Sequence, residues 1–289
     1  MTIEVWGIVG AGLATLAAGL ALARGRFNAA SGVEKVLVLG PVFEAVALAM
    51  FAAEHFTAAR SLMGVVPKWL PGPLFWVYFV GTAWLAAAIS MVVWRQVRWS
   101  AAGVWLLMWI FVATFDLPML PNGPHDRFFW ILTVRELAFG SGALVLAGSF
   151  WPGGVSTAIT RVGRWIVGAT MVFYAIEHFL HPLHVPGVPL ELLTPAWIPA
   201  PRLIAYVVGM TLLIGGGWLL TGRAVRAVAA QSGVVLLLLT ALFYVPIFVM
   251  EMHTASALEG LNYVGDTLLW AATVLLAGLG AEPGTGNRD

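Results

Sequence analysis

The chain contains nine apolar runs of about 20 residues, and this pattern constrains its fold more than any other feature. A helix needs about 20 apolar residues to cross the hydrocarbon core of a bilayer. Charged residues make up only 10% of the chain, against about 25% in soluble domains. We therefore predict an all-α polytopic membrane protein with nine transmembrane helices. The predicted spans cover residues 3–23, 36–58, 74–94, 100–119, 129–150, 164–181, 202–220, 229–250 and 262–280.

The basic residues divide unevenly between the two sets of connecting loops. If the spans alternate in direction, one side receives Arg24, Arg26, Lys35, Arg95, Arg98, Arg161, Arg164, Arg223, Arg226 and Arg288, and the other receives Arg60, Lys68, Arg127 and Arg202. Cytoplasmic loops carry the excess of Lys and Arg. The chain is thus expected in the cell membrane with its N-terminus outside and its C-terminus in the cytoplasm. All six histidines then fall near the outer face: His55, His125, His178, His181, His184 and His253.

One tripeptide occurs twice, as Glu54-His55-Phe56 and Glu177-His178-Phe179. Each copy ends an apolar run and precedes a proline-rich segment that contains a tryptophan, residues 67–73 and 195–201. A charged pair beside lipid is costly, so its duplication suggests that the two segments belong to a longer repeat.

Further matches extend this repeat over most of the chain. Residues 113–118 align with 241–246, and residues 146–148 align with 276–278. The spacing between matched positions changes only in loops, where variation in length is tolerated. The repeat predicts one N-terminal helix followed by two four-helix units. Because four is an even number, both units enter the membrane from the same side and are parallel repeats.

The repeat divides the chain into four parts. Residues 1–34 are expected to hold an N-terminal transmembrane helix and a cytoplasmic loop that begins at about residue 24. The two four-helix bundle units are expected at 35–151 and 152–280. The remaining residues, 281–289, are short and polar, and we expect a disordered cytoplasmic tail.

Several of these motifs resemble the DoxX-like integral membrane proteins. The resemblance rests on a helix that ends in His-Phe, a Pro-x-Trp-Leu-Pro-x-Pro segment at 67–73, and the entry Arg98-Trp-Ser-Ala-Ala102 to a later helix. DoxX-like units are four-helix bundles, so the resemblance implies a tandem duplication. The chain departs from the family after the proline loops, where Gly81 and Gly209 are not followed by the glutamate that relatives often carry. Some members are described as subunits of quinone-linked oxidoreductases.

Polar side chains interrupt the predicted spans and are the candidate binding residues. A charge at bilayer depth costs about 2.5–3.5 kcal/mol on insertion scales, so these groups should face the bundle interior and pair. In one interpretation Arg135 pairs with Glu44 or Glu136, and the Glu-His motifs only pack at the interface. In the other, the groups form an outward-facing polar cavity for a small molecule, a cation, or a lipid or quinone head group. The candidates are Glu44, Glu54, His55, Asp116, Arg135, Glu136, Glu177, His178 and Asp266.

A second cluster has the spacing of metal ligands. Glu177, His181 and His184 stand at i, i+4 and i+7, so they share one face if the segment is helical. Pro182, however, disfavours helical backbone at the preceding residue, so the helix is expected to end near His181. The alternative is a partly solvated, histidine-rich turn without a metal.

The sequence leaves the function open between three classes. The first is an accessory or small-ligand-binding membrane protein with no assigned reaction. The others are a quinone-linked membrane oxidoreductase subunit and a proton-coupled transporter of small solutes. The sequence does not decide whether the protein catalyses a reaction. The cofactors compatible with these classes are a quinone or a metal ion, and the expected partners are the lipid bilayer and other subunits of a membrane complex. A net charge of +1 gives no reason to expect nucleic acid, and the absence of cysteine excludes thiol chemistry.

Overall fold

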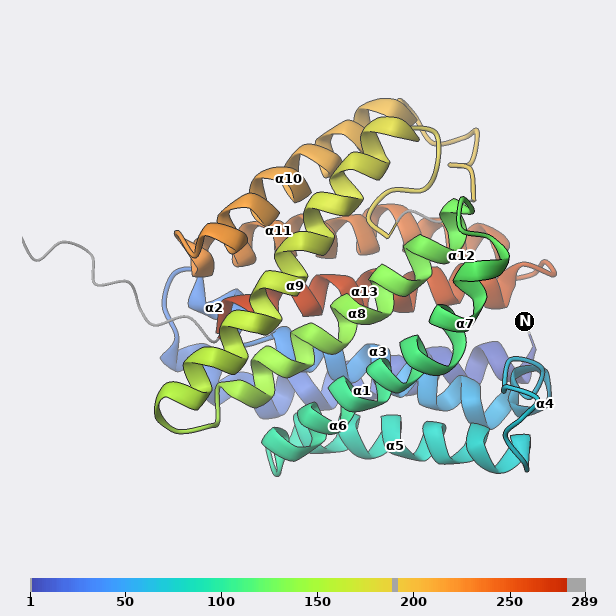
Figure 1. The fold of residues 1–289 in the computed structure, drawn as a ribbon, viewed down its shortest axis with the longest axis horizontal. Coiled ribbons are helices and arrows are strands. Elements are labelled where there is room, and N and C mark those ends of the chain that lie inside the picture. The colour runs from blue at the N-terminus through green and yellow to red at the C-terminus, as the bar shows by residue number, and fades with distance from the viewer. Residues whose placement is uncertain (1, 189–191, 280–289) are drawn as a thin grey trace, which may run out of the picture.

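The computed structural model describes residues 2–188 and 192–279, and within these ranges the chain is built from helices. The only extended pairing in the described part is a single antiparallel bridge between His184 and Leu193. The long helices lie side by side as a bundle (Figure 1). The predicted all-helical class is therefore confirmed for these residues. The predicted tail, 281–289, lies outside the described residues.

Each of the nine predicted segments is largely helical, and most boundaries are shifted by only a few residues. The first half contains α1 (Ile3–Ala29), α2 (Glu34–Leu37), α3 (Gly40–Thr57), α4 (Ala59–Leu62), α5 (Pro73–Val93), α6 (Val97–Phe111), α7 (Leu117–Met119) and α8 (Arg127–Gly148). The second half contains α9 (Gly153–Leu180), α10 (Pro201–Thr221), α11 (Val225–Leu239), α12 (Val245–Glu251) and α13 (Ala257–Leu279). In the described residues, seven helical segments are long and apolar enough to cross a membrane: Ile3–Ala29, Glu34–Thr57, Pro73–Val93, Val97–Asn122, Arg127–Gly148, Pro201–Thr221 and Val225–Glu251.

Two expected boundaries were wrong. The loop expected from residue 24 begins later, because α1 continues to Ala29. The guanidinium of Arg26 lies 3.9 Å from the ring centroid of Trp94, so this basic residue is accommodated on the helix against an aromatic face. Helix α9 begins at Gly153 rather than near residue 164, and its first turns carry polar residues that hydropathy alone assigns to a loop.

Prolines shape the helices that follow α6 and α11. A π-helical turn covers Val112–Asp116, where the amide of Leu117 donates to the carbonyl of Val112. A second π-helical turn covers Thr240–Tyr244, at the aligned position of the second half. Pro118 and Pro246 follow these turns and have no N–H to donate to the carbonyl four residues earlier, which favours the wider turn.

Left-handed backbone conformations also recur at aligned positions of the two halves. Gly72 and Ala200 both have positive φ immediately before α5 and α10. Trp94 and Gly222 have positive φ at the ends of the same two helices. The chain therefore enters and leaves each of these helices through a left-handed residue.

Helix α13 lies at the centre of the bundle. It packs on α3, α8 and α11, and the side chains of Trp270, Leu275 and Leu276 are fully buried. Within each half of the chain, α3 packs on α5 and α6 on α8, as α9 packs on α10 and α11 on α13. Between the halves, α3 contacts α13 and α8 contacts α9. Helix α3 of the first half therefore packs on α13, the last helix of the second half, and α9, the first helix of the second half, packs on α8, the last helix of the first.

One end of the bundle, here called the histidine end, is formed by residues 58–72, 120–126, 181–188 and 252–256, together with the helix ends that these segments join. It lies on the right in Figure 1, near the label N. All six histidines lie at this end.

Helices α9 and α10 approach each other through glycines, and this contact gives a test of the packing. A Cβ atom on Gly216 would lie 2.6 Å from the carbonyl oxygen of Gly168, whereas a Cβ on Gly217 would meet nothing within 4 Å. We expect Gly216→Ala to lower the free energy of unfolding by about 1–3 kcal/mol, because the two backbones must separate. Gly217→Ala, one position along the same helix, should be neutral or slightly stabilising. Thermal unfolding of both variants in detergent measures the difference, and equal midpoints would contradict this packing.

Candidate functional site

A cavity of about 470 Å³ opens at the histidine end, between the last turn of α3, the 62–70 segment, α5 and the α6 helix with its π-helical turn. Its walls are apolar and aromatic except for the hydroxyl of Thr114 and three ionisable side chains, His55, Asp116 and Glu136. The remaining lining residues are Leu62, Val65, Val66, Pro67, Trp69, Leu70, Trp76, Val77, Phe79, Val80, Leu107, Ile110, Phe111 and Phe115. Three of the predicted binding residues are thus brought to one cavity.

His55 is held in one orientation at the cavity wall. Its Nδ1 lies 2.7 Å from the carbonyl oxygen of Phe51, one turn earlier on α3. Because a carbonyl only accepts, Nδ1 carries the proton, and the neutral ring has Nε2 as its acceptor. Gly81 of α5 lies against the other side of the residue, since a Cβ there would be 2.7 Å from the Cβ of His55. A glycine at this position lets the two helices meet while the imidazole keeps its orientation.

Asp116 ends the first π-helical turn and lines the cavity. Its Oδ2 is buried and has no hydrogen-bond partner in the described part of the chain. Such turns displace the side chains that follow them from the regular helical face, and they are frequent at functional sites. A buried acceptor without a partner is costly, so this carboxyl is the group that a ligand would satisfy.

Arg135 forms the centre of a buried ionic cluster between α8 and α13. Its Nη1 lies 2.7 Å from Oδ2 of Asp266, and its Nη2 lies 3.0 Å from Oε1 of Glu136. The three side chains are only 13–16% exposed. Glu136 belongs to the cluster and to the cavity wall, so it connects the cavity to the centre of the bundle.

Of the two partners that the sequence interpretation offered for Arg135, Glu136 is confirmed, whereas Glu44 does not pair with it. The side chain of Glu44 is 1% exposed, and neither carboxyl oxygen has a hydrogen-bond partner among the described residues. Gly40, one turn earlier, lies against Leu275 and Leu276 of α13. The carboxyl is therefore enclosed in the apolar centre of the bundle, on a helix that the Arg135 cluster does not use.

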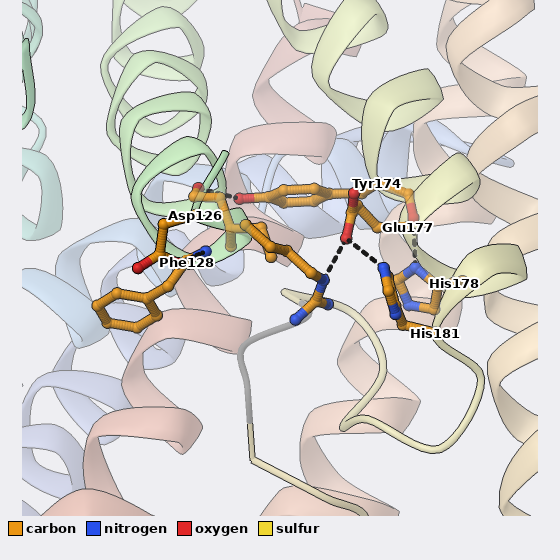
Figure 2. A network of polar contacts seen from close by, with 8 residues as sticks. Asp126, Phe128, Tyr174, Glu177, His178 and His181 are labelled. Carbon is orange, nitrogen blue, oxygen red and sulfur yellow. Dashed lines mark hydrogen bonds and ion pairs between the residues drawn. The ribbon is translucent and has the colours of Figure 1, made fainter. Parts of the chain in front are cut away.

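The glutamates of the two Glu-His-Phe motifs join the two halves of the chain. Oε1 of Glu54 accepts a hydrogen bond from Nδ2 of Asn262 on α13, at 3.0 Å. Oε2 of Glu177 lies 2.5 Å from Nε of Arg127 at the start of α8 (Figure 2). Next to this ion pair, the hydroxyl of Tyr174 donates to the carbonyl of Ile131 at 3.1 Å. Each glutamate therefore contacts the last helix of the other half.

The predicted metal ligands are not assembled as a metal site. Helix α9 ends at Leu180, which confirms the effect of Pro182, and the chain turns so that His184 leaves the helical face. Oε2 of Glu177 is 4.0 Å from Nε2 of His181 but is held by Arg127 (Figure 2). In residues 2–188 and 192–279, no three His, Asp or Glu side chains come together closely enough to hold a metal ion.

His178 has the same local geometry as His55, but its Nε2 is occupied by the chain itself. Its Nδ1 lies 2.5 Å from the carbonyl oxygen of Tyr174, and its Nε2 accepts the amide of Gly187 at 2.8 Å. The hydroxyl of Tyr244 donates to the carbonyl of Pro186. Residues 185–188, here called the inserted loop, are buried among these groups.

Sequence reasoning missed Tyr244, Gly187 and Asn262, which complete these contacts. The sequence feature that could have indicated these contacts is the length of the loop that follows each Glu-His-Phe motif. The stretch from His178 to Ala200 is five residues longer than the stretch from His55 to Gly72. An insertion of this size gives the loop enough residues to turn into the bundle and reach the histidine of the motif.

The fold and the site together are consistent with a helical membrane protein that has an apolar core, one buried ionic cluster and a cavity at one end. A family model described as a domain of unknown function (DUF8561) matches residues 44–127. The match runs from α3 to the first residue of α8, so it includes Glu44, His55 and Asp116 but not the Arg135 cluster. No curated protein and no solved structure gives a significant match.

Proposed function

We propose that the chain is a multi-pass protein of the cell membrane that binds a small amphiphilic ligand in the cavity between α5 and α6. It would act as an accessory or ligand-binding protein rather than through a reaction of its own. The observation that carries the proposal is the cavity itself: a volume of about 470 Å³ with apolar walls and three ionisable groups among its lining residues. Binding pockets for small molecules typically measure about 300–1,000 Å³ and combine apolar walls with a few polar groups.

Nine membrane-spanning helices are part of this proposal. Helices α9 and α13 have 28 and 23 residues, enough to cross a bilayer. Polar residues lower the hydropathy of both helices, and α13 needs few lipid-facing residues because its neighbours cover it. With nine spans, the uneven distribution of Lys and Arg supports an external N-terminus, an external histidine end and a cytoplasmic C-terminus.

Two DoxX-like four-helix units after α1 are also part of the proposal. The paired π-helical turns and the paired left-handed residues recur at the same spacing along the chain as the sequence matches. The helix contacts pair in the same order in both halves. The first unit is α3 to α8 and the second is α9 to α13.

The proposal is tested by filling the cavity. Thr114 lines it, and Leu242 is the exposed residue at the aligned position of the second half. We expect Thr114→Trp to weaken the binding of small amphiphiles at least tenfold, because the indole occupies their space, while Leu242→Trp leaves binding unchanged. The probes are 4-phenylbutanol, 4-phenylbutylammonium and a short-chain ubiquinone, and apparent Kd values come from their effect on the thermal midpoint of protein in nanodiscs. If no probe binds, or if both variants behave alike, the cavity is not the ligand site.

A further inference from the structure

We propose that the cavity of the first unit takes a ligand whose polar end is a protonated amine, and that the same position in the second unit is closed by the inserted loop, residues 185–188. This inference rests on the proposed function, because it requires the two units and a ligand in the cavity. The chain then carries one amine site rather than two, and the second unit shows which groups the site offers.

The two histidines direct Nε2 to the same place in each unit. Nδ1 is bonded to the carbonyl four residues earlier in both, at 2.7 Å for His55 and 2.5 Å for His178. A glycine of the next helix fixes each residue, since an added Cβ would lie 2.7 Å from the Cβ of His55 for Gly81 and 2.9 Å from that of His178 for Gly209. In both units Nε2 is therefore left as an acceptor at the same position.

In the second unit the protein fills this position with its own backbone. The amide of Gly187 is the donor to Nε2 of His178, at 2.8 Å. Gly187 has a φ of +96° and an added Cβ would lie 2.7 Å from Leu239, so a glycine is required where the loop enters. On the other side of the inserted loop, the hydroxyl of Tyr244 donates to the carbonyl of Pro186, and Tyr244 is only 1% exposed.

In the described residues of the first unit, no loop covers the position next to Nε2 of His55 that the inserted loop fills in the second unit. Asp116 and Phe115 stand where the second unit has Tyr244 and Phe243, and both are half-buried around the cavity instead of buried under a loop. The shorter connection, residues 58–72, is described throughout; it lines the cavity through Val65 and Trp69, and none of its backbone amides donates to His55. The first unit thus has the acceptor without the internal donor.

Asp116 occupies the position that Tyr244 has in the second unit, and this difference indicates which hydrogen-bonding groups the ligand carries. A hydroxyl donates to a carbonyl, whereas an ionised carboxyl accepts only. With Asp116 ionised, this carboxyl and Nε2 of His55 are both acceptors, so a ligand bound beside them carries donors toward each. An ammonium group offers three donors and no acceptor.

The local charge favours the same ligand. Glu136 and Asp266 pair with the guanidinium of Arg135, and a third carboxyl group, Asp116, lines the same cavity as Glu136. An anionic head group would add to this negative excess, and a quinone carbonyl would find acceptors rather than donors. A cation also gains from the faces of the aromatic rings in the wall.

The apolar part of the ligand has space beyond the head group. A second cavity of about 390 Å³ lies between α5 and α6 toward the opposite end, and it shares Phe79, Leu107 and Ile110 with the first. An alkyl or aryl-alkyl chain can therefore extend between these two helices from an amine held near Asp116.

The test compares ligands that differ only in their polar end. We expect 4-phenylbutylammonium to bind at least tenfold more tightly than 4-phenylbutanol, and 4-phenylbutyrate to bind more weakly than either. Asp116→Asn should remove the preference for the amine and change the alcohol's Kd less than twofold, while Asp116→Glu should retain the preference. Tyr244→Phe, at the matched position of the second unit, should leave the amine-to-alcohol ratio unchanged.

The outcomes separate this inference from the proposed function. If the alcohol or the ubiquinone binds as tightly as the amine and Thr114→Trp still blocks binding, the cavity is a ligand site but not an amine site. The amine assignment also fails if Asp116→Asn keeps the preference, or if Tyr244→Phe reduces it as much. If none of the probes binds, both proposals fail.

Discussion

Replacing Arg135 by Met is expected to lower the free energy of unfolding by about 3–5 kcal/mol, the largest effect of any single substitution considered. Arg135 is the partner of both Asp266 and Glu136, at 2.7 and 3.0 Å. Removing it leaves two carboxyl groups close together without a counter-charge, in a part of the bundle that is only 13–16% exposed. Breaking a buried pair in this way is far more costly than replacing the whole cluster by neutral groups.

Two further variants control for this effect. The triple variant Arg135→Met, Glu136→Gln, Asp266→Asn removes all three charges and should recover most of the lost stability. Arg24→Met, at an exposed position of α1, should change stability by less than about 0.5 kcal/mol. Unfolding in mixed micelles by titration with a denaturing detergent measures all of them. A loss below about 1 kcal/mol for Arg135→Met would show that the cluster does not hold α8 to α13.

Replacing Glu44 by Met is expected to stabilise the protein by roughly 1–3 kcal/mol, the opposite direction from most core substitutions. The Glu44 carboxyl is 1% exposed and has no hydrogen-bond partner in the described part of the chain, so burial costs free energy without compensation. Methionine has a similar length and no polar group, and its flexible chain adapts to the available space. The thermal unfolding midpoint should rise.

The matched control for Glu44 is a partnered acid on the same helix, Glu54, which lies nearer the histidine end of α3. Its Oε1 accepts a hydrogen bond from Asn262, so Glu54→Met leaves that amide without its acceptor and should destabilise the protein. Glu44 takes part in proton transfer if Glu44→Met instead lowers stability and abolishes uptake of 4-phenylbutylammonium driven by a proton gradient in proteoliposomes. The transporter interpretation would then replace the accessory one.

Much of the fold could be predicted from local sequence. Hydropathy located long helices, and seven helical segments of the described residues are apolar enough to cross a membrane, because about 20 apolar residues in a row exclude most alternatives. Pro182 placed the end of α9 correctly, since a proline disfavours helix at the residue before it. Errors arose where side chains from elsewhere in the chain supported a helix, as the ring of Trp94 does for Arg26.

The candidate site was only half predictable. The sequence identified the rare ionisable groups of the spans, and three of them, His55, Asp116 and Glu136, line the cavity. It could not assign partners among equally plausible acids. Arg135 pairs with Glu136, one of the two acids that the sequence offered, and also with Asp266, which is distant in the sequence. The second pairing could not be predicted, because the rotation of α8 and α13 about their axes decides which side chains meet.

From local sequence alone follow the positions of the apolar helical segments, the end of α9 before Pro182 and the identity of the polar groups, because hydropathy, proline chemistry and residue type act within a few residues of the chain. Tertiary structure alone decided that the two Glu-His-Phe motifs have different surroundings. Nε2 of His178 is occupied by Gly187 from the inserted loop, whereas His55 faces a cavity. Two copies of the same tripeptide cannot show this difference, since it depends on additional loop residues and on which wall they reach.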